Sequence, residues 1–93
     1  MIREELNQSL INASLAGDAE EVKSLLEAGA DVHAMDDYAL RRASYRGHDE
    51  VVKVLLDAGA NIHARDDIAL RSASYRGHAE VVKLLTDWKG VTE

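Results

Sequence analysis

The sequence predicts an all-α solenoid in which three helix-turn-helix repeats are stacked. The main observation is internal repetition, because the 22 residues that start at Asp36 recur from Asp66 with 17 identities and an offset of 30. Repeats of this length usually form one supersecondary unit each. The second observation is composition: proline is absent, and residues that favour helices, such as alanine, leucine and glutamate, are plentiful. A single helical hairpin cannot bury its apolar face alone, so the three repeats are expected to stack around one continuous core.

The offset divides the whole chain into repeats. We assign residues 1–93 to a single domain, with repeats at about 1–35, 36–65 and 66–93. The first repeat is the most diverged, and the third is the shortest. Three glycines mark the same position in successive repeats: Gly17, Gly47 and Gly77.

In the middle repeat, the first helix is expected at about 37–46. Asp36 or Asp37 can cap its free amide groups, since aspartate is favoured at the N-cap. Gly47 is placed to adopt the left-handed conformation that commonly follows a helix. The same pattern returns thirty residues later.

The second helix of the middle repeat is expected at about 50–58, and Gly59 ends it. In the first repeat, Asp18 and Glu21 have the spacing of a capping box at the start of this helix. Apolar residues recur along the helix of the middle repeat at helical spacing: Val51, Val52, Leu55 and Leu56.

The outer repeats differ from the middle one where no neighbour would cover them, as expected at the ends of a solenoid. Glu21 stands in the place of Val51, and Thr86 stands in the place of Leu56. Trp88 is expected to pack over the last hairpin.

Three motifs follow one another in the middle repeat: a first helix similar to T-P-L-H-x-A-A, a G-H-x-E-[IV]-V start of the second helix, and an L-L-x-x-G-A-[DN]-[VI] exit. The matching residues are Leu40, Ala43, Gly47, His48, Glu50, Val51, Val52, Leu55, Leu56, Gly59, Ala60, Asn61 and Ile62. With these motifs the sequence resembles the ankyrin repeat over nearly its whole length. The resemblance implies a non-catalytic scaffold that binds other proteins.

The sequence departs from the ankyrin pattern between Ala34 and Leu40. The period is 30 residues, against about 33 for the family, and the missing residues fall where the family has its β-hairpin finger. The finger is therefore expected to be reduced or absent, which favours binding by the first helices. Proline-free repeats of 30 residues also resemble ankyrins encoded by large viruses and some bacteria, a hint about origin only.

A stripe along the first helix of each repeat is the candidate binding surface. Positions 38 and 42, like their equivalents 68 and 72, differ between the repeats and share one helix face. Tyrosine and arginine continue this face, and both are enriched at protein interfaces. The resemblance adds that ankyrins habitually bind through these positions. The predicted binding residues are Tyr38, Arg42, Tyr45, Arg46, Arg65, Ile68, Ser72, Tyr75 and Arg76; the equivalent stripe of the first repeat is Gln8, Asn12, Leu15 and Ala16.

Charge is distributed unevenly along the chain. Segments 38–48 and 68–78 hold five of the seven arginines and no acidic residue, although the formal net charge is −6. This pattern predicts a partner protein with an acidic surface. Two interpretations stay open. Arg41 and Arg71 either hold the short loops by pairing with Asp36, Asp37, Asp66 or Asp67, or they face the partner. Tyr45, Arg46, Tyr75 and Arg76 either contact the partner or form a solvated, self-stacked ladder.

The four histidines do not predict a metal site. The two members of each equivalent pair, His33 with His63 and His48 with His78, are one repeat apart, which is about 8–10 Å between stacked helices. Zinc ligands must all lie about 2 Å from the metal. We expect His33 and His63 to form a hydrogen-bond ladder along the loops, and His48 and His78 to support the turn into the second helix.

No catalytic motif is recognised, so the protein is not expected to be an enzyme and no cofactor or metal is expected. Ser14, Ser44 and Ser74 occupy a small packing position of the family rather than a nucleophile site. There is no cysteine, no apolar run of about 20 residues and no signal-peptide pattern at the start. These features predict a cytoplasmic protein (in the host cytoplasm if viral) that does not bind membranes.

The sequence is compatible with three functions. The main hypothesis is a protein-binding module that presents tyrosine and arginine on its concave first-helix face; by analogy, a specific version is a standalone inhibitor, such as a viral or phage protein that blocks a host defence factor. The second is nucleic-acid binding by the arginine stripe, which the acidic net charge disfavours. The third is self-assembly into a homo-oligomer.

Overall fold

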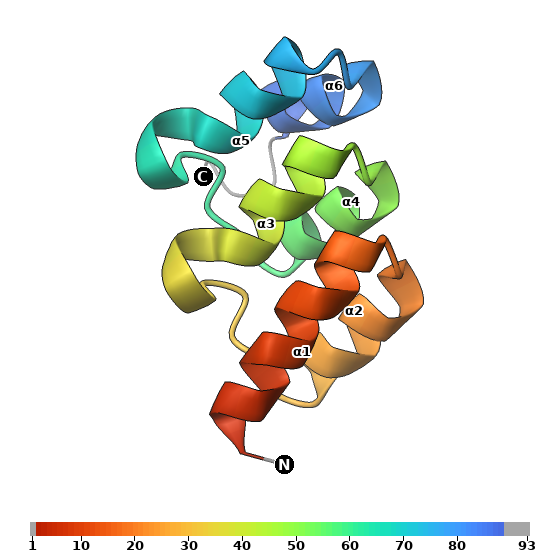
Figure 1. Cartoon of the computed structure of the whole chain (residues 1–93), viewed down its shortest axis with the longest axis vertical. Helices are drawn as coiled ribbons and strands as arrows, with labels where there is room; N and C mark the ends of the chain where they lie inside the picture. The colour runs from red at the N-terminus through yellow and green to blue at the C-terminus, as the bar shows by residue number, and fades with distance from the viewer. Residues whose placement is uncertain (1, 89–93) are drawn as a thin grey trace.

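The computed structural model describes residues 2–88, so the end of the third repeat, 89–93, lies outside the described residues. The described part of the chain contains six helices and no strand (Figure 1). None of these helices is both long and apolar enough to cross a membrane. The helices are α1 (Arg3–Ala16), α2 (Ala19–Glu27), α3 (Ala34–Arg46), α4 (Asp49–Asp57), α5 (Ala64–Tyr75) and α6 (Ala79–Asp87).

The helices form three antiparallel pairs that stack in chain order, as the repeats predict. The first helices α1, α3 and α5 lie side by side in one layer, and the second helices α2, α4 and α6 form the other (Figure 1). Each helix contacts its partner within the repeat and the equivalent helix of a neighbouring repeat. The all-α solenoid expected from the sequence is therefore confirmed.

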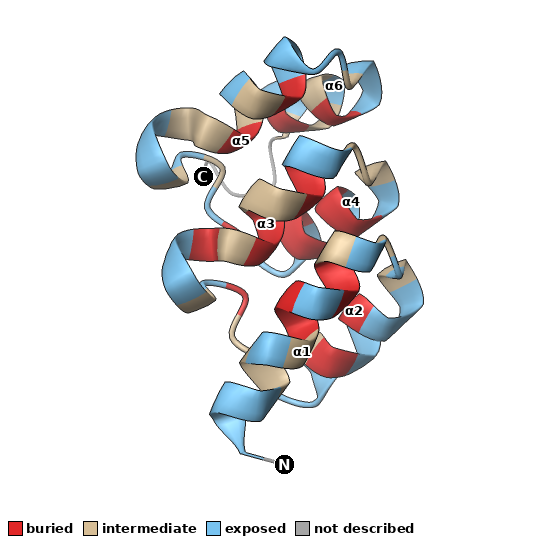
Figure 2. Ribbon diagram, viewed as in Figure 1, coloured by how far each residue is buried: buried red, intermediate tan, exposed pale blue. Residues whose placement is uncertain are grey.

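The core lies between the two layers and is continuous from repeat to repeat (Figure 2). It is best sealed in the middle repeat, where Leu40, Val51, Val52 and Leu55 are each 0% exposed. In contrast, Leu70, which is equivalent to Leu40, is only half-buried. The reason is position in the stack: α3 packs between α1 and α5, whereas within the described residues α5 has a neighbouring first helix on one side only.

The β-hairpin finger is replaced by a left-handed turn. Met35, Asp36 and Asp37 have φ values of 57°, 58° and 58°, and Arg65–Asp67 repeat this conformation. Consecutive left-handed residues that are not glycine are uncommon, because Cβ approaches the following carbonyl oxygen. The turn reverses the chain within three residues, so no finger projects from the stack.

The predicted aspartate cap is wrong, although the right-handed part of the helix begins within one residue of the predicted start at about 37, after the left-handed residues 35–37. α3 begins at Ala34 and includes the left-handed turn, and no side chain caps its first amides. The carboxylate of Asp37 is instead buried (4% exposed), where Oδ2 accepts a 2.7 Å hydrogen bond from the amide of Asn61. In the first repeat, Asn7 Oδ1 accepts in the same way from the amide of Asp31 at 2.7 Å. This position thus ties the first helix to the loop that leaves the second helix.

Other predicted ends are confirmed. Gly47 has φ +78°, the left-handed conformation expected after α3. Asp18 Oδ1 accepts from the amide of Glu21 at 3.1 Å, which is one half of the capping box. The other half is missing, because the amide of Asp18 donates to Ala13 O. Trp88 packs against the core, half-buried, as predicted.

Candidate functional site

The centre of the predicted stripe is a cluster around the ring of Tyr45 on α3. The Arg42 guanidinium carbon lies 4.8 Å from the ring centre, and that of Arg76, from α5, lies 4.3 Å from it. Arg76 Nη1 also donates to the tyrosine hydroxyl at 3.2 Å. A cation over an aromatic face is attracted by the ring quadrupole. The second and third repeats are therefore joined on this surface by a self-stacked arginine–tyrosine contact.

Tyr75 and Arg46 are the outward-facing members of the stripe. Tyr75 is 92% exposed, although its equivalent Tyr45 is only 37% exposed. Arg46 is also exposed, and its side chain forms no hydrogen bond or ion pair with any other described residue. These two side chains have no role in the packing of the described repeats. The ladder interpretation thus holds for Tyr45 and Arg76, while Tyr75 and Arg46 are free to meet another molecule.

Tyr38 and Arg42 lie deeper than the sequence suggested. Tyr38 is half-buried against the core, and the guanidinium of Arg41 lies 5.0 Å from its ring centre. Arg42 is half-buried too, and its Nε has no hydrogen-bond partner within the described residues. Both can therefore offer only part of their surface to a partner.

Arg41 and Arg71 hold the loops, but through carbonyl groups rather than carboxylates. Arg41 Nε donates to Asp36 O at 3.0 Å, and its Nη2 donates to Met35 O at 3.0 Å. Arg71 Nε donates to Asp66 O at 3.1 Å. Each arginine thus binds the left-handed turn of its own repeat. The two arginines therefore bind the loops that the sequence predicted, but the acceptors are backbone carbonyl oxygens and not the predicted carboxylates.

The three other predicted residues lie at the rim of the stripe. Arg65 forms an exposed 3.0 Å ion pair with Asp36, which joins the two left-handed turns. Ser72 donates its hydroxyl to Ile68 O at 2.6 Å within α5, and Ile68 is half-buried. The guanidinium of Arg65 and the hydroxyl of Ser72 are therefore already bonded within the protein.

The histidines serve the scaffold. His48 Nε2 donates to Leu15 O at 3.0 Å and His78 Nε2 donates to Tyr45 O at 2.8 Å, so each closes the turn of the preceding repeat. His33 Nδ1 lies 3.0 Å from Asp37 Oδ1, and Asp37 Oδ2 accepts from the amide of Asn61 in the next loop. Asn61 Oδ1 in turn accepts from the amide of His63 at 2.9 Å, so both histidines belong to the predicted hydrogen-bond ladder along the loops. Within residues 2–88, no three potential ligands are grouped to hold a metal ion.

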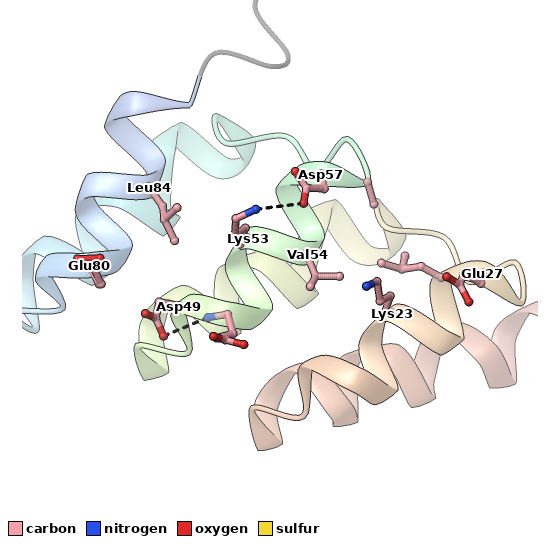
Figure 3. Close-up of a pocket in the computed structure, with 11 residues that line it drawn as sticks. Lys23, Glu27, Asp49, Lys53, Val54, Asp57, Glu80 and Leu84 are labelled. Atoms are coloured by element: carbon pink, nitrogen blue, oxygen red, sulfur yellow. Dashed lines mark hydrogen bonds and ion pairs between the residues drawn. The ribbon is translucent and has the colours of Figure 1, made fainter.

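A second surface was not predicted. A groove of about 710 Å³ lies on the other layer of the stack, over α2, α4 and α6 (Figure 3). The sequence contained a signal for it: positions 54 and 84 differ between repeats and are apolar, although most of their neighbours on the same helix face are charged.

The geometry defines a class of protein: a solenoid of helical hairpins whose repeats are joined by hydrogen bonds from histidine side chains. A family model that describes three copies of the ankyrin repeat matches residues 9–92, and the chain belongs to the ankyrin-repeat family. Ankyrin repeats are generally protein–protein interaction modules and are typically non-catalytic. Among curated proteins, no significant match is found.

Proposed function

We propose that the protein binds a partner protein through the stripe on α3 and α5, with Tyr75 and Arg46 as the principal contacts. The observation that carries this proposal is the 92% exposure of Tyr75 beside an ordered arginine–tyrosine cluster. Tyrosine and arginine dominate the binding energy of many protein interfaces, because they combine a large contact area with directed hydrogen bonds. An exposed tyrosine leaves apolar surface in contact with water, and a partner that packs against it would bury that surface.

The cluster around Tyr45 supports the same proposal through preorganisation. Arg42 from α3 and Arg76 from α5 both contact the ring of Tyr45, and Arg76 also donates a hydrogen bond to the tyrosine hydroxyl. A partner that meets this surface therefore loses little side-chain entropy in ordering it, and preorganised surfaces bind more tightly for that reason. Affinity should come from the exposed Tyr75 and Arg46, and shape specificity from Tyr45, whose ring is held by the two arginines.

Charge favours a partner with an acidic surface. The stripe carries several arginines, and the ion pair of Arg65 with Asp36 lies at its rim. Carboxylates on a partner can accept paired hydrogen bonds from guanidinium groups. We propose further that binding acts by blocking the partner's own surface. The specific version is an inhibitor such as a viral or phage protein that neutralises a host defence factor; it rests on analogy alone.

The test uses the intact protein and a lysate of the organism from which it comes. Wild-type protein and the double variant Tyr75→Ala/Arg46→Ala are used to capture partners from a lysate of the source organism, and the partner is then purified and titrated by calorimetry. Since each side chain is exposed and unbonded, the variant should fold normally and lose affinity by about tenfold or more. Glu20→Ala, an exposed change on α2, is the matched control and should bind like the wild type.

Two results would contradict the proposal. If the purified partner binds the double variant with unchanged affinity while circular dichroism shows an intact fold, the stripe is not the binding surface. If the captured molecule is a nucleic acid whose affinity falls steeply with salt, the arginine stripe recognises phosphates instead. Once the partner is known, its activity with and without the protein decides whether binding inhibits it.

A further inference from the structure

The groove on the second-helix layer has an apolar centre. α4 lies between α2 and α6, and each of the three helices contributes one half-buried apolar side chain to the lining (Figure 3). These are Leu26, Val54 and Leu84. Stacking does not require an apolar residue at the position of Val54, because Ser24 occupies the equivalent place in the first repeat. The apolar patch therefore exceeds what the scaffold needs.

The groove is framed by negative charge. Five carboxylates and two ammonium groups line it, which gives a net charge of −3. Lys53 is already engaged, since its Nζ lies 3.7 Å from Asp57 Oδ2 (Figure 3). The carboxylates come from all three helices: Glu27, Asp49, Glu50, Asp57 and Glu80.

Apart from Asp49 at its start, the lining residues of α4 and of its C-cap, Ala58, lie on a single helix face. Glu50, Lys53, Val54, Asp57 and Ala58 all line the groove, and they follow the i, i+3, i+4, i+7, i+8 spacing of one stripe. A helix that packs against such a stripe presents the same spacing in return, with apolar anchors at its centre and polar residues at its edges. The groove thus fits an amphipathic helix better than an extended strand, because α4 offers no free backbone edge for pairing.

We propose that this groove docks a basic amphipathic helix of a partner protein. Leucine or similar side chains of that helix cover Val54 and Leu84, and its lysines or arginines meet the carboxylates at the rim. A second copy of this chain is disfavoured as the occupant, because the protein carries a formal net charge of −6 and two copies repel each other. The groove and the stripe on α3 and α5 lie on opposite layers, so the two proposals are independent.

The probe is a synthetic peptide of leucine and lysine with helical amphipathic spacing, roughly 14 residues or about 21 Å of helix. Calorimetry measures its affinity at low salt, and amide chemical shifts locate it. The perturbed amides should map to 23–27, 49–58 and 80–84. The variant Glu50→Lys/Glu80→Lys should weaken binding by about tenfold or more, and Val54→Ser/Leu84→Ser should also weaken it.

Matched controls separate the groove from a general attraction between opposite charges. Glu4→Lys/Glu5→Lys changes the net charge by the same amount at the exposed start of α1 and should alter the affinity by less than about threefold. A scrambled peptide of equal charge should bind much more weakly than the amphipathic one. Tyr75→Ala/Arg46→Ala should bind the amphipathic peptide like the wild type, which distinguishes this site from the stripe.

The proposal is overturned if both charge-reversal variants lose affinity equally, or if the scrambled peptide binds as well as the amphipathic one. It is also overturned if sedimentation shows a self-associating protein that becomes monomeric when Glu50 and Glu80 are reversed. That result would make a second copy the occupant. A monomeric wild type with shifts confined to α2, α4 and α6 supports the proposal.

Discussion

The imidazole of His78 lies directly against Gly47 of the preceding repeat. A Cβ atom at Gly47 would lie 2.6 Å from His78 Nδ1, closer than side-chain carbons approach other atoms. The same ring donates its Nε2 proton to Tyr45 O at 2.8 Å. Gly17 and His48 repeat this relationship, with a distance of 2.8 Å from the hypothetical Cβ. The repeated glycine thus ends a helix and also admits the histidine that joins the next repeat.

We predict that Gly47→Ala destabilises the protein for two reasons. Alanine at φ +78° costs about 1–2 kcal/mol in the left-handed region. The clash with His78 adds about 1–3 kcal/mol, the usual cost of overpacking a well-filled site. Urea denaturation should therefore show a loss of roughly 2–5 kcal/mol in the free energy of unfolding.

Gly77→Ala is the matched control for this prediction. Gly77 has φ +76°, but no described atom lies within 4 Å of the position its Cβ would take. It should lose only the conformational part, about 1–2 kcal/mol. Equal losses at Gly47 and Gly77 would show that the histidine yields and that the close approach carries no energy.

A second prediction concerns the buried hydroxyl of Ser44. The side chain is 0% exposed, and its Oγ has no hydrogen-bond partner within the described residues. An unsatisfied buried polar group costs about 1–3 kcal/mol, so Ser44→Ala should stabilise the protein by about 1 kcal/mol and raise Tm by about 4–8 °C. Ser74 is exposed at the equivalent position. Thermal denaturation of Ser74→Ala should show almost no change, and a fall in Tm for Ser44→Ala would contradict the prediction.

The left-handed turn provides a third prediction. Met35 has φ 57° and is 68% exposed, so its side chain contributes little to packing. Met35→Gly should stabilise the protein by about 0.5–1 kcal/mol, because relief of the steric cost outweighs the greater backbone entropy of glycine when unfolded. Met35→Ala keeps the Cβ atom and should give no gain. If both variants have the same chemical denaturation midpoint, the turn is not left-handed in solution.

A fourth prediction tests the contact between Tyr45 and Arg76. A double-mutant cycle with Tyr45→Leu and Arg76→Leu should give a coupling of about 0.5–1 kcal/mol, the range for exposed cation–π pairs. The cycle of Tyr75→Leu with Arg76→Leu is the control and should show no coupling, since Tyr75 is 92% exposed. Coupling that is absent from both cycles would mean that Arg76 does not hold the ring in solution.

The repeated segments made most of the fold predictable. Val51, Val52 and Leu55 recur at helical spacing with their equivalents thirty residues later, and this periodicity reflects burial along a helix, a local property of the chain. For Gly47, the sequence predicted only the left-handed backbone conformation that ends the helix. Its contact with His78 could not be predicted, because it depends on how closely successive repeats approach.

The turn at Met35–Asp37 could not be predicted from the neighbouring residues. Aspartate before a helix usually acts as an N-cap, and this local rule led to a cap at Asp36 or Asp37. The structure uses Asp37 for the amide of Asn61, 24 residues away. Asp37 therefore serves a contact between two repeats, which a rule about neighbouring residues cannot predict.

The sequence by itself determined the number of repeats, their helices, their family and the absence of a long finger, because these follow from spacing and length along the chain. Only the tertiary structure decided which of the repeated side chains pack against a neighbouring repeat and which are exposed to solvent. Tyr45 and Tyr75 have identical neighbours in the sequence, yet Arg76 packs against Tyr45 across the repeat interface while Tyr75 is 92% exposed. The physical reason is stacking: identical segments acquire different surroundings when one has a repeat on both sides and the other, within the described chain, on one side only.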